Sequence, residues 1–257
     1  MSTYYNPKRT RNLFQENSKF RLSRSKIDLF IECPQCFYFD RKLGVARPPS
    51  FPFTLNSAVD QLLKKEFDIY RSQQRPHPLM QSHHINAIPY DHVNMEIWRD
   101  SLRNGITYNL PNTNLEITGG VDDIWINPEG ELIIVDYKAT SKESQVNLDA
   151  EWQNGYKRQM EIYQWLFRKN GFKVSKTGYF VYANADAGAD AFNHTLKFEI
   201  SILPYDGNDS WVENTIYEAF SCLQSEEIPK SSQNCDYCNY RNAVDEVISE
   251  PKQTSLL

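Results

Sequence analysis

Long apolar runs are missing from this sequence of 257 residues, and none approaches the roughly 20 residues that a membrane-spanning helix needs. Its first segment, Met1 to Lys8, also lacks the apolar core of a secretory signal. No internal repeat is present, and no linker is long enough to force a division into separate domains. These absences argue against a membrane protein and a repeat protein, and we expect a cytoplasmic one.

A net positive charge is also missing: the formal charge at pH 7 is −5. This value does not indicate a nucleic-acid-binding protein, but it does not exclude one, because only a local basic face is needed. Basic residues are concentrated near the start of the chain, at Lys8, Arg9, Arg11, Lys19, Arg21, Arg24 and Lys26. They form either such a face or a solvated, partly disordered arm.

Histidine is scarce, and four of the five histidines lie between Ser72 and Asn94, together with three prolines. Their spacing matches no metal-binding template, so we expect this segment to be a loop. The hydrophobic content of 40% is ordinary for a globular protein with a sizeable core. We expect a basic, partly irregular lead-in over residues 1–22, a single domain over 23–245 and a flexible tail over 246–257.

Two β-rich runs, together spanning Glu116 to Lys138, predict a hairpin. Asn127 at the first position, Pro128 at the second and Gly130 at the fourth favour a type I turn followed by a bulge. This loop places Ile124 opposite Ile134 and, two residues further along, Asp122 opposite Asp136.

Side chains alternate along a strand, so Lys138 falls on the same face as Asp136. Opposed carboxylates have Cβ atoms roughly 4.5–5.5 Å apart and repel each other, which calls for a cation between them. A hard divalent ion such as Mg²⁺ binds carboxylate oxygens. The alternative is a surface hairpin with incidental acids, because an acid followed two residues later by lysine occurs elsewhere in this chain, as in Asp40-Arg41-Lys42.

Apolar residues at helical spacing predict three longer helices, over about Thr54 to Arg71, Trp152 to Phe167 and Trp211 to Leu223. A shorter helix, capped by Ser25, is expected before Cys33-Pro34. Alternating or buried apolar runs predict strands over Gly178–Tyr182 and about Leu196–Ile202.

Three motifs resemble those of the PD-(D/E)XK nucleases, most closely the RecB-like branch that includes the CRISPR-associated exonucleases. They are Gly120-Val121-Asp122, Asp136-Tyr137-Lys138 and Gln159-x-x-x-Tyr163, and the likeness extends from about Ser23 to Arg241. It implies an α/β fold with a restriction-endonuclease-like core, in which helices flank a central mixed β-sheet. It also implies a Mg²⁺- or Mn²⁺-dependent deoxyribonuclease of the exonuclease kind that acts on single-stranded DNA or DNA ends, with a possible helicase or recombination partner.

The resemblance also implies roles for individual residues. Asp122, Asp136, Lys138, Gln159 and Tyr163 are the expected catalytic residues. The expected metal ligands are Asp122, Asp136, the carbonyl of Tyr137 and Asp60. Many RecB-like relatives carry a histidine where this chain has Asp60. That departure supports the alternative of an inactive nucleic-acid-binding or scaffold module on the same fold.

Two C-x-x-C pairs lie near opposite ends of the predicted domain, at Cys33 and Cys36 and at Cys235 and Cys238. Paired thiols of this spacing indicate a metal more than a disulfide in an intracellular protein. Four thiolates hold either zinc or an iron–sulfur cluster, and spacing alone favours zinc. The family resemblance favours a [4Fe–4S] cluster, with structural Zn²⁺ as the alternative. Cys222 is expected to be a small core residue.

Overall fold

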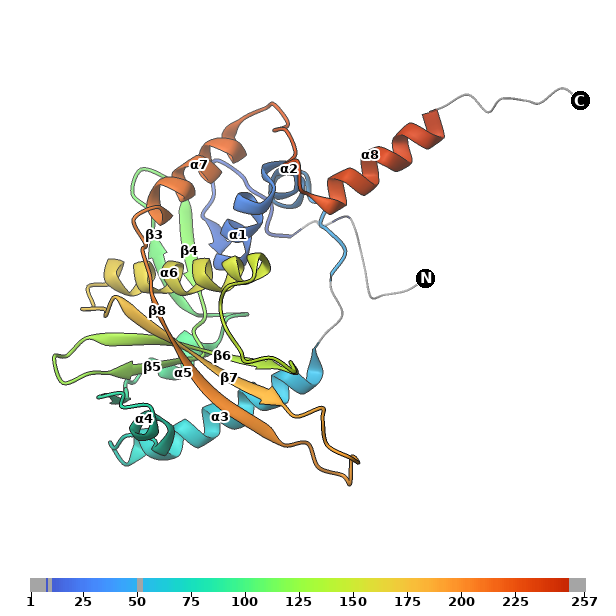
Figure 1. Cartoon of the computed structure of the whole chain (residues 1–257). Coiled ribbons are helices and arrows are strands. Elements are labelled where there is room, and N and C mark those ends of the chain that lie inside the picture. The colour runs from blue at the N-terminus through green and yellow to red at the C-terminus, as the bar shows by residue number, and fades with distance from the viewer. Residues whose placement is uncertain (1–7, 9–10, 50–52, 250–257) are drawn as a thin grey trace, which may run out of the picture.

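Two β-sheets form the framework of the protein (Figure 1). The structure is a computed structural model, and it describes residue 8, residues 11–49 and residues 53–249. The larger sheet has the strand order β2 (Ile88–Pro89), β5 (Asp123–Ile126), β6 (Leu132–Thr140), β7 (Thr177–Ala185) and β8 (Phe198–Asp206). Because β6 and β7 are parallel while the other pairs are antiparallel, the sheet is mixed, which confirms the predicted fold class.

The smaller sheet was not predicted. It has the order β1 (Phe20–Ser23), β4 (Leu115–Gly119) and β3 (Ile106–Asn109), with β1 parallel to β4. The last residues of the basic, partly irregular lead-in expected over residues 1–22 belong to β1, which begins at Phe20. Residues 1–7 and 9–10 of that lead-in lie outside the described residues.

The predicted hairpin between β5 and β6 is confirmed. Ile124 pairs with Ile134, the N–H of Gly130 donates to the carbonyl of Asn127 at 3.0 Å, and Gly130 has φ of +75°. The left-handed conformation at Gly130 is the one that the bulge requires. The last ladder pair joins Asp123 and Val135, so Asp122 and Asp136 follow in register just beyond the ladder.

The run from Glu116 to Ile126 is divided between the two sheets, which the alternating pattern did not predict. Gly119 and Gly120 lie at the division. A Cβ at Gly119 would come 2.7 Å from the ring of Tyr163, and one at Gly120 would come 2.4 Å from Cβ of Ser101. The close approach requires glycine at both positions, and Asp122 lies in the short segment that joins the two sheets.

The helices are α1 (Arg24–Glu32), α2 (Pro34–Tyr38), α3 (Thr54–Ser72), α4 (Pro78–Ser82), α5 (Met95–Arg99), α6 (Asn154–Lys169), α7 (Val212–Gln224) and α8 (Asp236–Ser249). Two of them depart from the expectation: α4, with β2, interrupts the predicted loop over residues 72–94, and α1 begins at Arg24, so Ser25 lies within it and does not cap it. None of the described helices is both long and apolar enough to cross a membrane.

Helices α3 and α6 cover opposite faces of the larger sheet, as predicted. Residues of β6 alternate between two cores: Val135 packs in one with Phe67 of α3, and Ile134 packs in the other with Met160 of α6. The C-terminal end of β6 lies between these two helices. The residues of β6 are therefore buried as far as Tyr137, and its last three residues are half-buried.

Helix α8 extends away from the rest of the protein (Figure 1), and Cys238 is its one buried residue. Residues 246–249, which were expected to begin a flexible tail, belong to this helix. Residues 250–257 lie outside the described residues. The attachment of α8 to the body is therefore concentrated at its first turns.

Candidate active site and cysteine cluster

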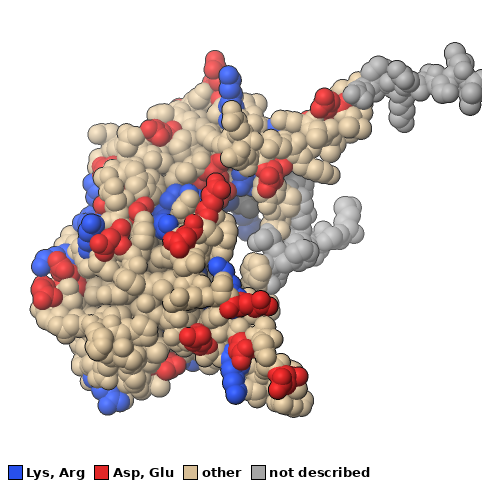
Figure 2. Space-filling model, in the orientation of Figure 1, with Lys and Arg blue, Asp and Glu red and all other residues tan. Residues whose placement is uncertain are grey.

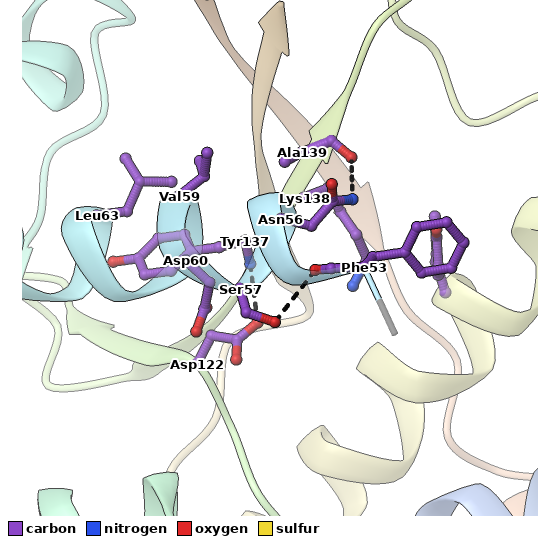
Figure 3. A pocket seen from close by; sticks show the side chains of 11 residues that line it. Phe53, Asn56, Ser57, Val59, Asp60, Leu63, Asp122, Tyr137, Lys138 and Ala139 are labelled. Carbon is purple, nitrogen blue, oxygen red and sulfur yellow. Dashed lines mark hydrogen bonds between the residues drawn. The ribbon is translucent and has the colours of Figure 1, made fainter. Parts of the chain in front are cut away.

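A pocket of about 390 Å³ opens where β6 ends between α3 and α6 (Figure 3). It is lined by Phe53, Asn56, Ser57, Val59, Asp60, Leu63, Asp122, Tyr137, Lys138, Ala139 and Tyr156. The polar part of this lining contains two carboxylates and one ammonium group. The pocket therefore brings Asp60, Asp122 and Lys138 together.

The carboxylate of Asp122 is held from two sides. Its Oδ2 accepts a hydrogen bond from the N–H of Tyr137 at 3.0 Å, and its Oδ1 accepts one from Nζ of Lys64 at 3.0 Å. Lys64 also donates to Asp60 at 2.8 Å, so it joins the two acids. Although burial lowers the pKa of Lys64, the charge of Asp122 and a hydrogen bond to Asp60 raise it above its ordinary value. Burial and the charge of Asp122 raise the pKa of Asp60.

Asp136 is 0% exposed. Nε2 of Gln159 donates to its Oδ1 at 2.7 Å, and its other oxygen pairs with Nζ of Lys138. Burial raises the pKa of Asp136 to about 6, with Asp122 adding to the rise and Lys138 opposing it. The two carboxylates are thus close enough to interact electrostatically, and the Lys138 ammonium interacts with both.

Lys138 is enclosed as well as paired. Its Nζ lies 4.4 Å from the ring centroid of Tyr156, which provides a cation–π contact. Burial lowers the pKa of Lys138, but the neighbouring Asp136 and Asp122 raise it above its ordinary value. Lys138 is therefore a fixed positive charge at the pocket.

Gln159 and Tyr163 lie on one side of α6 and face Asp136. Gln159 donates to the hydroxyl of Tyr163 at 3.3 Å as well as to Asp136. Burial raises the pKa of Tyr163. Arg24 of α1 stands beside them: although burial lowers its pKa, Tyr163, Asp28 and Asp136 together raise it. Tyr163 is buried, and its hydroxyl contacts Gln159 inside the site.

Asp123 differs sharply from its neighbour Asp122. It is fully buried, its carboxylate pairs with Arg71 and Arg99, and its Oδ2 accepts a hydrogen bond from the hydroxyl of Tyr137 at 2.7 Å. A buried carboxylate with two guanidinium partners is stable only while both remain. Asp123 therefore fixes β5 against α3 and α5, whereas Asp122 is available to the pocket.

Sequence reasoning missed three residues of this site: Lys64, Tyr156 and Arg24. The spacing of Asp60 and Lys64, four residues apart on a helix, could have indicated their ion pair. Tyr156 was only part of the helix predicted over about Trp152 to Phe167, and Arg24 only one of the basic residues near the start. Their positions depend on long-range packing that the sequence pattern does not contain.

Among the residues that the structure describes, the basic residues near the start do not form one open face. Lys19 pairs with Glu116, Arg21 donates to the backbone carbonyl of Arg103, and Lys26 pairs with Asp40. Figure 2 shows basic and acidic side chains interspersed over the face it presents. Of the basic residues near the start, Arg24 contributes charge at the site, and Lys64 and Lys138 add further positive charge there.

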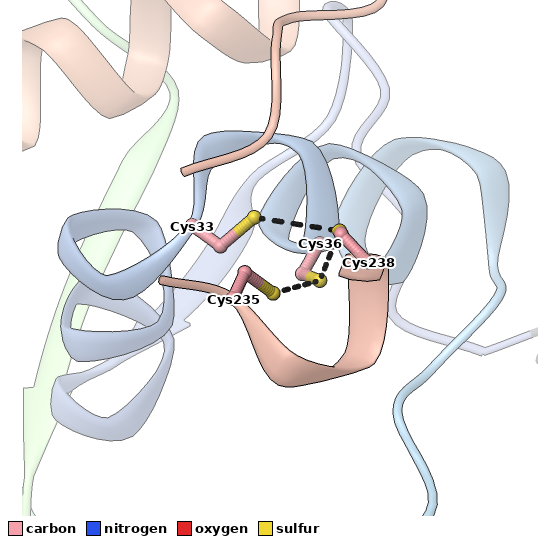
Figure 4. Close-up of side chains that lie close together, drawn as sticks. All are labelled: Cys33, Cys36, Cys235 and Cys238. Atoms are coloured by element: carbon pink, nitrogen blue, oxygen red, sulfur yellow. Dashed lines mark hydrogen bonds between the residues drawn. The ribbon is translucent and has the colours of Figure 1, made fainter. Parts of the chain in front are cut away.

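The four cysteines of the two C-x-x-C pairs come together in one buried cluster, here called the clasp (Figure 4), as expected if all four bind one centre. Cys33 and Cys36 come from the α1–α2 junction, and Cys235 and Cys238 from the start of α8. All four Sγ atoms lie within 4.8 Å of one another, and the Cys36–Cys238 separation is 3.5 Å. This buried group can bind a metal. Cys222 is partly buried against the core, separate from the cluster.

The surroundings of the cluster shift the pKa values of its thiols in different directions. Burial raises the pKa of Cys33, but backbone hydrogen bonds from Cys36 and Ser232 lower it to about 7. Arg47 donates to Sγ of Cys235 at 3.3 Å. Burial, together with contacts from the other three sulfurs, raises the pKa of Cys238. Four thiols packed this closely need a cation to ionise together.

Comparison with known protein families identifies the superfamily of this chain. A model of the PD-(D/E)XK nuclease superfamily matches residues 21–243, so this chain belongs to that superfamily, as its motifs predicted. No curated protein matches the chain. Among solved structures, the crystal structure of SSO0001 is similar over 89% of this chain and 86% of its own, with 16% identity and a TM-score of 0.41. Nucleases of this superfamily use divalent metal ions and act on nucleic acid.

Proposed function

We propose that the protein is a Mg²⁺- or Mn²⁺-dependent deoxyribonuclease of the RecB-like branch, exonuclease-like in action. The observation that carries this proposal is that Asp122 and Lys138 line one pocket of about 390 Å³, while the buried Asp136 pairs with Lys138 beside it. Superfamily membership supports phosphodiester hydrolysis. The RecB-like branch, the DNA substrate and a helicase or recombination partner rest on the sequence motifs.

The donor set suits a hard divalent ion. Asp122 and Asp136 supply carboxylate oxygens that are electrostatically coupled, and such oxygens are the preferred ligands of Mg²⁺ and Mn²⁺. We propose that these two residues and the carbonyl of Tyr137 hold the ion. Asp60, which Lys64 joins to Asp122, would be a further ligand to that ion. An ion bound there supplies Lewis-acid activation of the phosphate and of the attacking water.

The side chains of this chain have defined tasks in that reaction. Water forms a bond to phosphorus, the bond to one ester oxygen breaks, and that oxygen leaves with a proton. Lys138 offsets the negative charge that grows on the phosphate, an electrostatic effect of the kind that dominates many enzymes. Gln159 orients Asp136 through its hydrogen bond of 2.7 Å. The Tyr163 hydroxyl accepts a hydrogen bond from Gln159, and the charge of Arg24 attracts Asp136. Both interactions help to position these two residues.

A cleavage assay tests the proposal. End-labelled single-stranded and double-stranded DNA are incubated with the full chain and Mn²⁺, Mg²⁺ or EDTA, and the products are separated by length. We expect cleavage with either metal and none with EDTA. Mononucleotides released from one end would identify exonuclease action, and absence of cleavage under all conditions would contradict the proposal.

Lys64 gives a prediction about metal binding. Because its ammonium joins Asp60 and Asp122, Lys64→Met should destabilise the metal-free protein by roughly 1–3 kcal/mol, between the values for exposed and buried ion pairs. The uncompensated acids should then bind a divalent ion more tightly. Thermal unfolding with and without Mn²⁺ measures both effects. Lys65→Met is the matched control because Lys65 is exposed. An equal Mn²⁺ response in native protein and Lys64→Met would contradict the assignment.

A second candidate function is a nucleic-acid-binding or scaffold module without catalysis. The observation that favours it is Asp60, paired with Lys64 where RecB-like relatives carry a histidine. DNA binding that persists undiminished in Lys138→Ala, without metal-stimulated cleavage, would support this candidate against the nuclease.

We propose that the cysteine clasp holds one metal centre. A zinc–sulfur distance of about 2.3 Å in a tetrahedral site places the sulfurs about 3.8 Å apart. The closest separations here, 3.5 Å, 3.6 Å and 3.7 Å, are near that value. A [4Fe–4S] cluster, which the family resemblance favoured, needs a wider arrangement because each cysteine binds a different iron. The sulfur spacing therefore supports Zn²⁺, with the cluster as the alternative.

A further inference from the structure

Trp152 is displayed at the edge of the proposed active site. It lies in a 3₁₀ turn (Glu151–Gln153) immediately before α6, and it is 60% exposed. The other four tryptophans, Trp98, Trp125, Trp165 and Trp211, are buried or half-buried. An indole with this exposure is not explained by packing of the core.

The turn that carries Trp152 is fixed. The neighbouring Gln153 is fully buried, accepts a hydrogen bond from the N–H of Ala150 at 2.9 Å and donates to the carbonyl of Asn147 at 2.6 Å. The Trp152 ring meets Tyr156 edge to face, with centroids 5.5 Å apart. The exposed indole is therefore held in one place and not carried on a free loop.

Positive charge accompanies this ring. Nζ of Lys142 lies 5.4 Å from the centroid of Trp152. The backbone of Lys142 is itself fixed, because its N–H donates to Asn184 at 2.8 Å and its carbonyl accepts from Asn184 at 3.0 Å. Exposed aromatic rings beside lysines bind single-stranded nucleic acid, with bases stacked on the rings and phosphates near the cations.

A continuous path joins Trp152 to the proposed site of cleavage. Tyr156 touches Trp152 on one side, and on the other it lines the pocket with Lys138 above its ring. We propose that Trp152 is a stacking platform for a base of the unpaired strand whose phosphate lies at Lys138. Lys142 pairs with a phosphate of the same strand. The faces of paired bases are covered by their neighbours in a duplex, so this platform selects a strand that is unpaired next to the cut.

The inference rests on the proposed nuclease function, but binding tests it separately. A fluorescein-labelled oligothymidylate is titrated with native protein and variants in EDTA, and anisotropy is measured. We expect Trp152→Ala to weaken binding about tenfold or more, because one stacked base contributes that much. Trp152→Phe should stay within about threefold of native. Tyr240→Ala, which removes an exposed ring on α8 (75% exposed), should not change binding.

Fluorescence gives a direct signature of stacking. Because Trp152 is the exposed member of the five tryptophans, the oligonucleotide should quench native fluorescence and leave that of Trp152→Phe nearly unchanged. A blunt duplex should bind native protein and Trp152→Ala within about twofold of each other. With Mn²⁺, Trp152→Ala should raise KM for single strands and leave kcat within about threefold of native.

The outcomes separate the two proposals. Equal single-strand binding by native protein and Trp152→Ala overturns the platform, even if native protein cleaves DNA. No detectable single-strand binding by native protein also overturns it. If Trp152→Ala binds single strands more weakly but the native protein does not cleave DNA, the platform is supported and the proposed nuclease function is overturned.

Discussion

Asp136→Asn should abolish metal-dependent cleavage while leaving the fold intact. The asparagine has the same shape, and its carbonyl oxygen can still accept the hydrogen bond that Gln159 donates at 2.7 Å. What it removes is the negative charge that pairs with Lys138 and, in the proposed site, binds the divalent ion. Loss of one preorganised electrostatic group typically lowers the rate by about 10²–10³. Loss of a ligand to the ion should lower it at least as much.

Rates of Mn²⁺-dependent cleavage under single-turnover conditions measure this loss, and circular dichroism with thermal unfolding checks the fold. Asp245→Asn, a change of an exposed acid on α8, is the matched control and should cleave like native protein. Asp123→Asn should behave in the opposite way: it should lower stability first, because it leaves Arg71 and Arg99 without their shared partner. Cleavage by Asp136→Asn at the native rate would show that the Asp136 carboxylate is not needed for the reaction.

Local chemistry was enough to predict the hairpin and its register. Asn127, Pro128 and Gly130 specify one type of loop, and that loop alone determines that Ile124 faces Ile134. The stripes of α3 and α6 were equally predictable because their apolar residues recur with the helical period. Each of these features depends on residues that are close in sequence.

Features that depend on distant contacts could not be predicted in the same way. The division between β4 and β5 depends on Gly119 and Gly120 packing against Tyr163 and Ser101, which lie elsewhere in the chain. The alternating pattern of residues continues through those glycines without a break. For the same reason Asp122 and Asp123 look equivalent in sequence, and only the guanidinium partners of Asp123 distinguish them.

Removal of one thiolate from the clasp should have the largest effect on structure. Helix α8 buries only Cys238, and its other contacts to the body are few, among them the hydrogen bond from Arg241 to Gln35 at 2.7 Å. Structural zinc in isolated fingers contributes about 10–16 kcal/mol of apparent binding free energy, comparable with the net stability of a whole domain. Cys235→Ser should therefore release the metal and detach α8, while Cys222→Ser should retain both.

Hydrogen exchange measured by mass spectrometry should locate the damage. In Cys235→Ser the amides of α8 should exchange at nearly the unfolded rate, and those of β6 should stay protected, because β6 is enclosed by α3 and α6 and not by the clasp. Metal analysis of the native protein identifies the centre. One zinc per chain is expected from the sulfur spacing, whereas four irons with broad visible absorption would establish the cluster instead. Unchanged exchange in α8 after metal loss would mean that packing is sufficient to hold the helix. Such packing includes the guanidinium carbon of Arg47, which lies 4.6 Å from the ring centroid of Tyr237.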